Sequence, residues 1–237
     1  MNIEEQKDFY DRFWLQNNKL NSLKLRRSIK ILTYFVKVKK EFKDPTVLDL
    51  GCGEGRLTAF IGEFGFVEGI ELSQNAVERA NKLYPHVNYL QGDVLTHNFG
   101  EKKFDVVISQ EVIEHIEEIE QYIDVCHKVL NKGGYLILTT PNKKVLESMK
   151  EGSKWSNQPI EKVVTPASLK KLVSNKFRIL NYDSIVFNFG DKGYFKIINS
   201  RYVIGVINRM GLRKTREAIL GKLGFGLHQC IFAKKDE

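Results

Sequence analysis

Short apolar runs alternate with longer segments of helical spacing between residues 46 and 140. Runs that are apolar at consecutive positions are typical of strands in a parallel sheet, because helices cover both of its faces. The runs predict strands at 46–50, 66–71, 87–91, 104–109 and 135–140, and the spacing between them predicts helices at 56–63, 74–84 and 110–130. A turn at 131–134 is expected to end the last helix. This order predicts βαβ units around a parallel sheet.

Further elements are expected on either side of this region. Helices are predicted at 4–16, 25–38 and after Thr165, where Pro166 suits the first helical position, and strands at 177–189 and 225–233. The segment 191–224 carries apolar residues at every fourth position with basic residues around them, which predicts a basic amphipathic helical insertion. The predicted fold class is a doubly wound, seven-stranded, mostly parallel α/β sheet. A chain of 237 residues suits one domain of this kind.

A glycine-rich loop, Asp49-Leu50-Gly51-Cys52-Gly53-Glu54-Gly55, leaves the first strand and enters a helix. Such a loop lets backbone approach a ligand closely, although glycines also serve plain turns. Glu71 ends the second strand, where folds of this type place a carboxylate for ribose hydroxyls, and Asp93 follows the third strand, where a carboxylate can accept from an adenine amino group. Arg56 replaces the third glycine of the dinucleotide pattern, which disfavours NAD and FAD.

Together, the segments 47–55, 69–73, 92–94 and 104–109 resemble the class I S-adenosylmethionine-dependent methyltransferases over residues 46–142. The resemblance implies a Rossmann-like fold and S-adenosylmethionine as the cofactor. It also implies a set of cofactor-binding residues around the methionine, ribose, adenine and sulfonium portions. These are Asp49, Gly51, Cys52, Gly53, Glu71, Leu72, Asp93, Val94 and Gln110. In this interpretation 1–44 forms an N-terminal helical lid, 45–142 the cofactor-binding core, and 143–237 the substrate side with 191–224 as a basic cap.

The N-terminal helices supply further candidates. In the family a first helix often lies over the cofactor, so Tyr10 and Trp14 are candidates for a lid, with core packing as the alternative role. Arg26 or Arg27 is a candidate partner for the cofactor carboxylate, with solvation at the surface as the alternative.

The candidate catalytic residues follow the fourth strand. A helix starting at Gln110 would place Glu111, Glu114 and His115 on one face beside the methyl donor. His115 is the predicted general base, with Glu111 as the second catalytic residue, because methyl transfer to a hydroxyl needs one proton removed. The alternatives are a divalent ion such as Mg²⁺ held by the same groups, or an acidic helix start without a catalytic role.

Two branches of the family share the motif at 111–115. The small-RNA 2′-O-methyltransferases add a downstream histidine around a metal, whereas here the only histidine after His127 is His228, in the last predicted strand. The ubiquinone-type and the polysaccharide or sugar O-methyltransferases are similar also at 139–142 and 165–169, and this branch is favoured. The predicted function is O-methylation of a small polar or sugar-containing acceptor, and the alternatives are RNA ribose methylation or cofactor-binding regulation without turnover.

The charge is uneven along the chain. Residues before Lys143 include 18 basic and 21 acidic side chains, and those from Lys143 onward include 19 basic and 8 acidic ones. The basic insertion is therefore a candidate surface for an anionic sugar, a nucleotide-linked sugar or a lipid surface, whereas no RNA-binding module supports nucleic acid. Three separated cysteines, and an N-terminus without a signal pattern, lead us to expect reduced thiols and a cytoplasmic location. Neither the acceptor nor the oligomeric state follows from the sequence.

Overall fold

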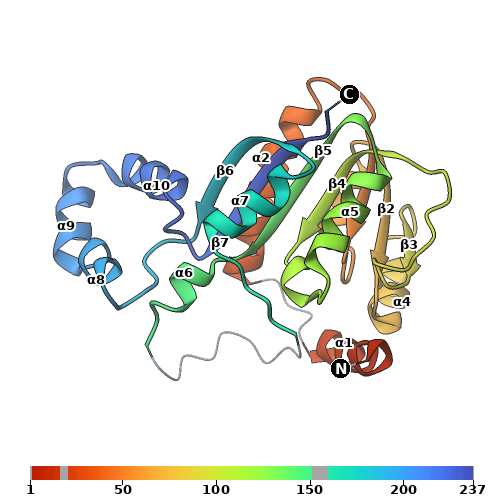
Figure 1. The fold of residues 1–237 in the computed structure, drawn as a ribbon, viewed down its shortest axis with the longest axis horizontal. Helices are drawn as coiled ribbons and strands as arrows, with labels where there is room; N and C mark the ends of the chain where they lie inside the picture. Colours follow the sequence, from red (N-terminus) through yellow and green to blue (C-terminus); the bar gives the residue numbers. More distant parts are fainter. Residues whose placement is uncertain (1, 17–20, 151–159, 237) are drawn as a thin grey trace.

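A seven-stranded sheet forms the centre of the molecule (Figure 1). The computed structural model describes residues 2–16, 21–150 and 160–236. The strand order is β3-β2-β1-β4-β5-β7-β6, and all neighbours pair in parallel except β7, which runs antiparallel to both β5 and β6. The strands are β1 (Thr46–Leu50), β2 (Phe66–Glu71), β3 (Asn88–Gln91), β4 (Phe104–Gln110), β5 (Leu130–Pro141), β6 (Arg178–Ile185) and β7 (His228–Lys234). The predicted fold class is confirmed.

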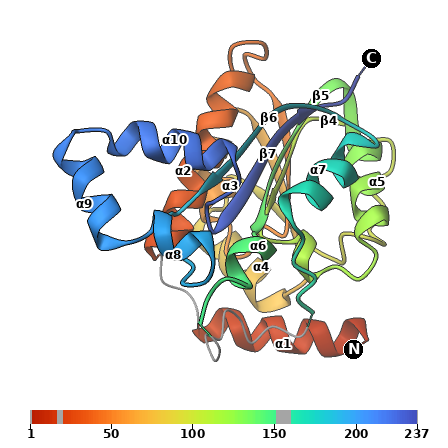
Figure 2. The ribbon, with the colours of Figure 1, turned by 60° about the vertical axis from the view of Figure 1, so that its left-hand side comes forward.

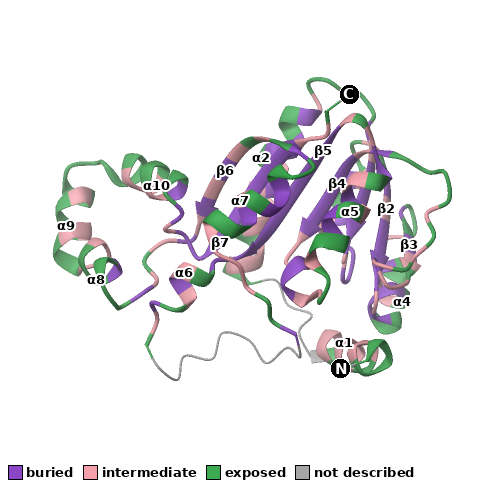
Figure 3. Cartoon of the chain, viewed as in Figure 1, coloured by how far each residue is buried: buried purple, intermediate pink, exposed green. Residues whose placement is uncertain are grey.

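Helices cover both faces of the sheet, and alternate residues of the central strands pack against each layer. Leu48 and Leu50 of β1 belong to the core under α5 and α7, whereas Val47 belongs to the core under α2, α3 and α4. Figure 3 shows the strands of the sheet buried between these layers. The helices up to α7 are α1 (Ile3–Gln16), α2 (Ser22–Val38), α3 (Arg56–Gly62), α4 (Gln74–Leu83), α5 (Ile119–Val129), α6 (Lys143–Leu146) and α7 (Pro166–Ser174), and a 3₁₀ turn, η1, spans Ile113–His115.

The helix predicted at 110–130 is wrong in its first part. Strand β4 continues through Gln110, which pairs with Thr139 of β5, and the backbone N–H of Glu111 still donates to the Thr139 carbonyl. Glu111 then takes a left-handed conformation with φ 58°, η1 follows, and α5 begins only at Ile119. Pairing across the sheet thus overrides the local helical preference of this acidic segment. The turn expected at 131–134 likewise lies within β5, where the pairing register shifts.

The helical insertion is present and is divided into three short helices. These are α8 (Tyr194–Ile198), α9 (Arg201–Arg209) and α10 (Arg213–Lys222). Ser200 caps α9 through its hydroxyl, and Gly211, with φ 71°, separates α9 from α10. Figures 1 and 2 both show the three helices as an arm that extends away from the sheet. In the part of the chain that the structure describes, no helix combines the length and the apolar character needed to cross a bilayer.

Candidate active site

A pocket of about 1190 Å³ lies at the carboxyl ends of the parallel strands, beneath α1. Ligands of open α/β sheets bind at this edge, where the strand order reverses, and here the reversal falls between β1 and β4. The pocket exceeds the usual range of about 300–1,000 Å³ for a single small ligand, so it has room for a cofactor and an acceptor. Of the residues predicted to bind the cofactor, the following line it: Asp49, Gly51, Cys52, Glu71, Leu72, Asp93, Val94 and Gln110.

The glycine loop needs its glycines for two reasons. Gly51 and Gly53 have φ values of 71° and 55°, a left-handed conformation that other residues rarely adopt. In addition, a Cβ atom on Gly51 would lie 2.4 Å from a methyl group of Val112, and one on Gly53 would lie 2.5 Å from the Trp14 ring. Gly53 does not line the pocket directly. Its N–H donates to the Glu71 carboxylate at 3.0 Å and so fixes that side chain.

Two buried carboxyl groups, at the ends of β1 and β2, can accept hydrogen bonds from a ligand in the pocket. Each oxygen of Glu71 accepts one backbone N–H, from Gly53 at 3.0 Å and from Ser73 at 3.1 Å, which leaves each oxygen a lone pair for a ribose hydroxyl. Asp49 accepts from the Thr58 hydroxyl at 2.6 Å. Burial raises the pKa of Asp49 to about 7 and also raises that of Glu71. A ligand that brings hydroxyls and positive charge therefore suits this pair.

Asp93 and Val94 lie on the neighbouring turn after β3, at the far end of the same edge. The Asp93 carboxylate accepts from the backbone N–H of Leu95 at 3.0 Å and from the Thr96 hydroxyl at 3.1 Å, which holds the turn in place. Val94 is buried. Both side chains line the pocket, and their expected role in adenine recognition stays a prediction.

Helix α1 lies across the pocket because one carboxylate joins it to the start of α4. Asp11 accepts from the Ser73 hydroxyl at 2.5 Å and from the Asn75 backbone N–H at 3.0 Å. Tyr10 and Trp14 of the same helix line the pocket, as expected for a lid. The indole N–H of Trp14 is buried and has no hydrogen-bond acceptor among the described residues, so it is available to a bound ligand.

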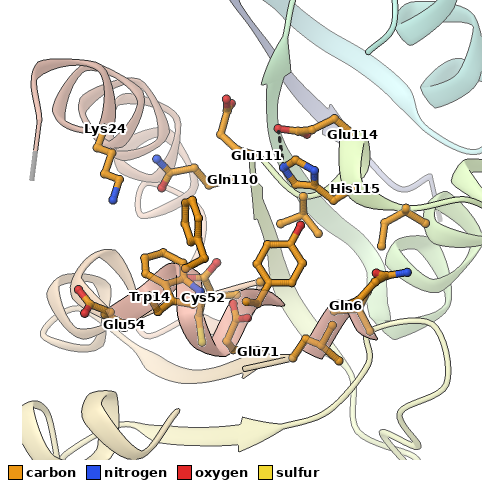
Figure 4. Close-up of a pocket in the computed structure, with 18 of the residues that line it drawn as sticks. Gln6, Trp14, Lys24, Cys52, Glu54, Glu71, Gln110, Glu111, Glu114 and His115 are labelled. Atoms are coloured by element: carbon orange, nitrogen blue, oxygen red, sulfur yellow. Dashed lines mark ion pairs between the residues drawn. The ribbon is translucent and has the colours of Figure 1, made fainter. Parts of the chain in front are cut away.

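Glu114 and His115 form the opposite wall of the pocket (Figure 4). His115 Nδ1 lies 2.8 Å from the Ile160 carbonyl oxygen, and His115 Nε2 lies 3.8 Å from Glu114 Oε1. The Glu114 carboxyl accepts from the Thr140 hydroxyl at 2.9 Å. Burial and the nearby Glu111 charge raise the pKa of Glu114 well above its usual value, and burial lowers the pKa of His115. These shifts favour the protonated carboxyl of Glu114 and the neutral imidazole of His115.

Glu111 belongs to a buried charged group that the sequence analysis missed. Its Oε2 atom lies 2.8 Å from His228 Nδ1 and 3.5 Å from the Arg27 guanidinium, which also contacts His228 Nε2 at 3.3 Å. Arginine can only donate, so His228 Nε2 accepts from Arg27, and the ring proton of a neutral imidazole is then on Nδ1, the atom that faces Glu111. Burial raises the pKa of Glu111, but the contacts with His228 and Arg27 outweigh it and hold this pKa well below the usual value.

The two candidate arginines and the possible metal ligands have the following places in the structure. Arg27 lines the pocket and binds Glu111, whereas Arg26 is exposed. No three His, Cys, Asp or Glu side chains within 2–16, 21–150 and 160–236 are arranged to hold a metal ion. His228 could have been identified only by assuming that the last strand pairs with β5. That pairing places His228 opposite Pro141 at the pocket edge.

Comparisons with known proteins agree with this geometry. A family model described as a methyltransferase domain matches residues 48–138. The ubiquinone biosynthesis O-methyltransferase of Pelagibacter ubique is 27% identical over 85% of this chain and 93% of its own length. The mitochondrial ubiquinone biosynthesis O-methyltransferase of Rattus norvegicus is 34% identical over 41% of this chain, but the match covers only 31% of that enzyme.

Residues 48–138 thus match a methyltransferase domain, in agreement with the resemblance to the class I S-adenosylmethionine-dependent methyltransferases. S-adenosylmethionine, the cofactor of this family, is thereby confirmed. The N-methyltransferase NodS from Bradyrhizobium japonicum, solved with S-adenosyl-L-homocysteine, has the same fold, with a TM-score of 0.63 at 13% identity over 99% of this chain and 97% of its own. The [4+2]-cyclase SpnF also shares the fold of the methyltransferase domain, with a TM-score of 0.58 at 18% identity over 87% of this chain and 81% of its own. The fold alone therefore does not define the reaction.

Proposed function

We propose that this protein transfers a methyl group from S-adenosylmethionine to a hydroxyl oxygen of a small acceptor, with His115 as the general base. The observation that carries this proposal is the contact between His115 Nδ1 and the Ile160 carbonyl at 2.8 Å. A carbonyl oxygen only accepts, so Nδ1 carries the proton and Nε2 keeps a lone pair. A neutral imidazole with this tautomer in the pocket wall can take a proton from an acceptor hydroxyl.

The surroundings of His115 support a base that is neutral before the reaction and stabilised after it. Burial lowers the pKa of His115, so the imidazole is free of its second proton at neutral pH. When His115 takes the acceptor proton, the resulting positive charge lies near Glu111, whose carboxylate stays ionised. Glu111 is therefore proposed as a fixed negative charge, held in place by Arg27 and His228. This gives the second predicted catalytic residue an electrostatic role.

The bound cofactor supplies an electrophilic methyl group on a sulfonium. Methyl transfer is an in-line displacement, so the protein mainly aligns the donor and the acceptor. Asp49, Glu71 and the glycine loop would hold the cofactor on one side of the pocket, and Glu114 and His115 lie on the other (Figure 4). The acceptor hydroxyl would lie between them.

The acceptor is proposed to be a small polar or sugar-containing molecule, including anionic or lipid-linked ones, and its O-methylation is supported by the names of the relatives. The experiment is incubation of the protein with S-adenosylmethionine labelled in the methyl group and with fractionated lysate. Label in an alkali-stable, non-amine product of low mass supports the proposal. Label in RNA favours the ribose-methylating alternative, and no label despite cofactor binding favours a regulatory protein.

The role of His115 is tested by His115→Ala against a control, His86→Ala, whose imidazole is half-exposed and paired with Glu63. Loss of a general base typically costs about 10²–10⁴-fold in rate. The wild-type rate is expected to fall as the pH drops through a value below 6.5, because the base must be unprotonated. This pH dependence should disappear in His115→Ala and persist in His86→Ala. Equal rates in wild type and His115→Ala would contradict the assignment.

A further inference from the structure

Helix α9 presents an apolar face that the rest of the protein does not cover. Within the helix and the residue after it, Tyr202, Val206 and Met210 follow one another at every fourth position and are 89%, 59% and 64% exposed. No residue of α9 is buried. Isolated surface leucines or valines are common, but an exposed row of this kind along one helix marks a contact surface.

Basic side chains accompany this row. Arg201 and Arg209 are the first and last residues of α9 and are exposed, and Arg209, seven positions after Tyr202, lies on the same side of the helix. Across the arm, residues 191–224 contain eight basic and two acidic residues, so most of the chain's net charge of +8 is concentrated here. On α10, Lys214 and Ile219 are exposed, and the exposed Leu223 follows the helix. The arm therefore combines apolar side chains with a local excess of positive charge.

The arm lies at the same edge of the sheet as the pocket. It begins after β6, which runs parallel to β5, and it returns at His228, the first residue of β7 and a contact of Glu111. Helix α10 packs against β6, and α9 packs against α8 and α10 (Figures 1 and 2). Both connections of the arm to the sheet therefore lie at the edge where the pocket lies.

We propose that the α8–α10 arm binds the surface of a membrane that contains anionic lipids, with Tyr202, Val206 and Met210 inserted among the lipids and the basic side chains near the headgroups. Helices that lie in a membrane interface have this combination of a wide apolar face and basic residues beside it. A nucleic acid is the less suitable partner, because it would meet the arginines and lysines but leave the apolar row exposed to water.

A membrane-bound arm would also bring the pocket close to acceptors that reside in the bilayer. This consequence rests on the proposed function, whereas membrane binding by the arm does not. The two are separated experimentally by measuring vesicle binding and the binding of S-adenosyl-L-homocysteine independently on each variant.

The test is co-sedimentation of the full chain with phosphatidylcholine vesicles that contain or lack phosphatidylglycerol. The wild type should bind the anionic vesicles and not the neutral ones. The triple variant Tyr202→Ser, Val206→Ser, Met210→Ser should lose roughly tenfold or more in partitioning, since binding scales with the apolar area inserted. A double variant, Arg201→Gln with Arg209→Gln, should lose about 30-fold, because each basic side chain near an anionic surface contributes about a factor of five.

A matched control removes an exposed apolar side chain far from the arm. Phe66, at the start of β2, is 72% exposed, so Phe66→Ser should leave vesicle binding unchanged. All variants should bind S-adenosyl-L-homocysteine like the wild type, which shows that the fold and the pocket are intact. Equal binding of the triple variant and the wild type to anionic vesicles, or binding to single-stranded RNA with no binding to vesicles, would overturn the proposal.

Discussion

Glu71→Gln should weaken cofactor binding strongly with little change in shape. The substitution replaces one carboxylate oxygen with an amide NH₂ group and removes the negative charge. In the wild type both oxygens accept backbone N–H groups, from Gly53 and Ser73, so an NH₂ group at either position faces a donor instead of accepting from it. The variant therefore cannot accept from both ribose hydroxyls.

The magnitude follows from these contacts. A hydrogen bond to a charged group is worth about 1.5–3 kcal/mol, and the variant loses one such bond and weakens a second. The expected loss is about 2–4 kcal/mol in binding free energy, or roughly 30- to 1,000-fold in Kd. Stability should fall by about 1–3 kcal/mol, the cost of a buried donor that faces another donor.

The assay is calorimetric titration with S-adenosyl-L-homocysteine and with its 2′-deoxy analogue. The wild type should bind the 2′-deoxy analogue more weakly than S-adenosyl-L-homocysteine. For Glu71→Gln this difference in affinity should be much smaller, because its contacts with the ribose are already impaired. Glu68→Gln on the same strand is the control, since Glu68 pairs with Lys102 at 2.6 Å and does not line the pocket. A folded Glu71→Gln protein with wild-type affinity would refute the assignment of Glu71 to the ribose.

Three further predictions concern the loop, the core and the proton balance. Gly53→Ala should reduce S-adenosyl-L-homocysteine affinity at least about tenfold in calorimetry, because its Cβ would displace the Trp14 ring and its φ of 55° is strained for alanine. Asn142→Ala should lower the free energy of unfolding, measured in urea, by about 2–4 kcal/mol. The reason is that the buried Asn142 amide donates to two loop carbonyls before β7. Asn88 is exposed, so Asn88→Ala should change the free energy of unfolding little. Near pH 6, binding of S-adenosylmethionine should release more protons than binding of S-adenosyl-L-homocysteine, whose sulfur is uncharged, as measured by calorimetry in several buffers. Burial raises the pKa of Asp49 to about 7, and a nearby sulfonium would lower it. Equal proton release by the two ligands would contradict this.

The same shift at Asp49 has a consequence for stability without ligand. The unfolded carboxyl ionises near its ordinary value of 3.8, whereas the folded one keeps its proton up to about pH 7. The unfolded state therefore binds fewer protons between these values, and this group's contribution to stability declines as the pH rises from about 4 to 7. Thermal unfolding of Asp49→Asn should lack this decline. A steeper decline in the variant would show that another group is responsible.

The local sequence pattern was sufficient to predict most strands of the sheet and the residues on the cofactor side of the pocket. The bounds of β1 and β2 agree with the sequence prediction because buried parallel strands are apolar on both faces, which is visible in the sequence itself. The loop that follows β1 and the acid that ends β2 lie at fixed positions relative to those strands. Their meeting in one pocket therefore follows from the strand order.

The residues after β4 could not be placed from local signals. The acidic run at Glu111 and Glu114 is typical of a helix start, which favours negative charge. In the structure, the backbone of Glu111 instead donates to Thr139 on the neighbouring strand. That bond joins segments far apart in the sequence, and it turns the Glu111 side chain toward Arg27 and His228. The sequence pattern placed Glu111, Glu114 and His115 near one another on one helix. In the structure the end of β4 and the turn η1, and not a helix, bring these residues to the pocket.

His228 shows why histidine spacing alone was a poor guide to this site. As the first residue of β7 it pairs with Pro141, and because β7 runs antiparallel beside β5, its first residue lies at the edge where β4 and β5 end. A histidine at that place reaches Glu111 whatever the length of the arm before it. The partner of Glu111 is therefore determined by sheet topology, and the arm between β6 and β7 can vary without moving it. This separation allows one segment to bind a surface while its end completes the buried charged group.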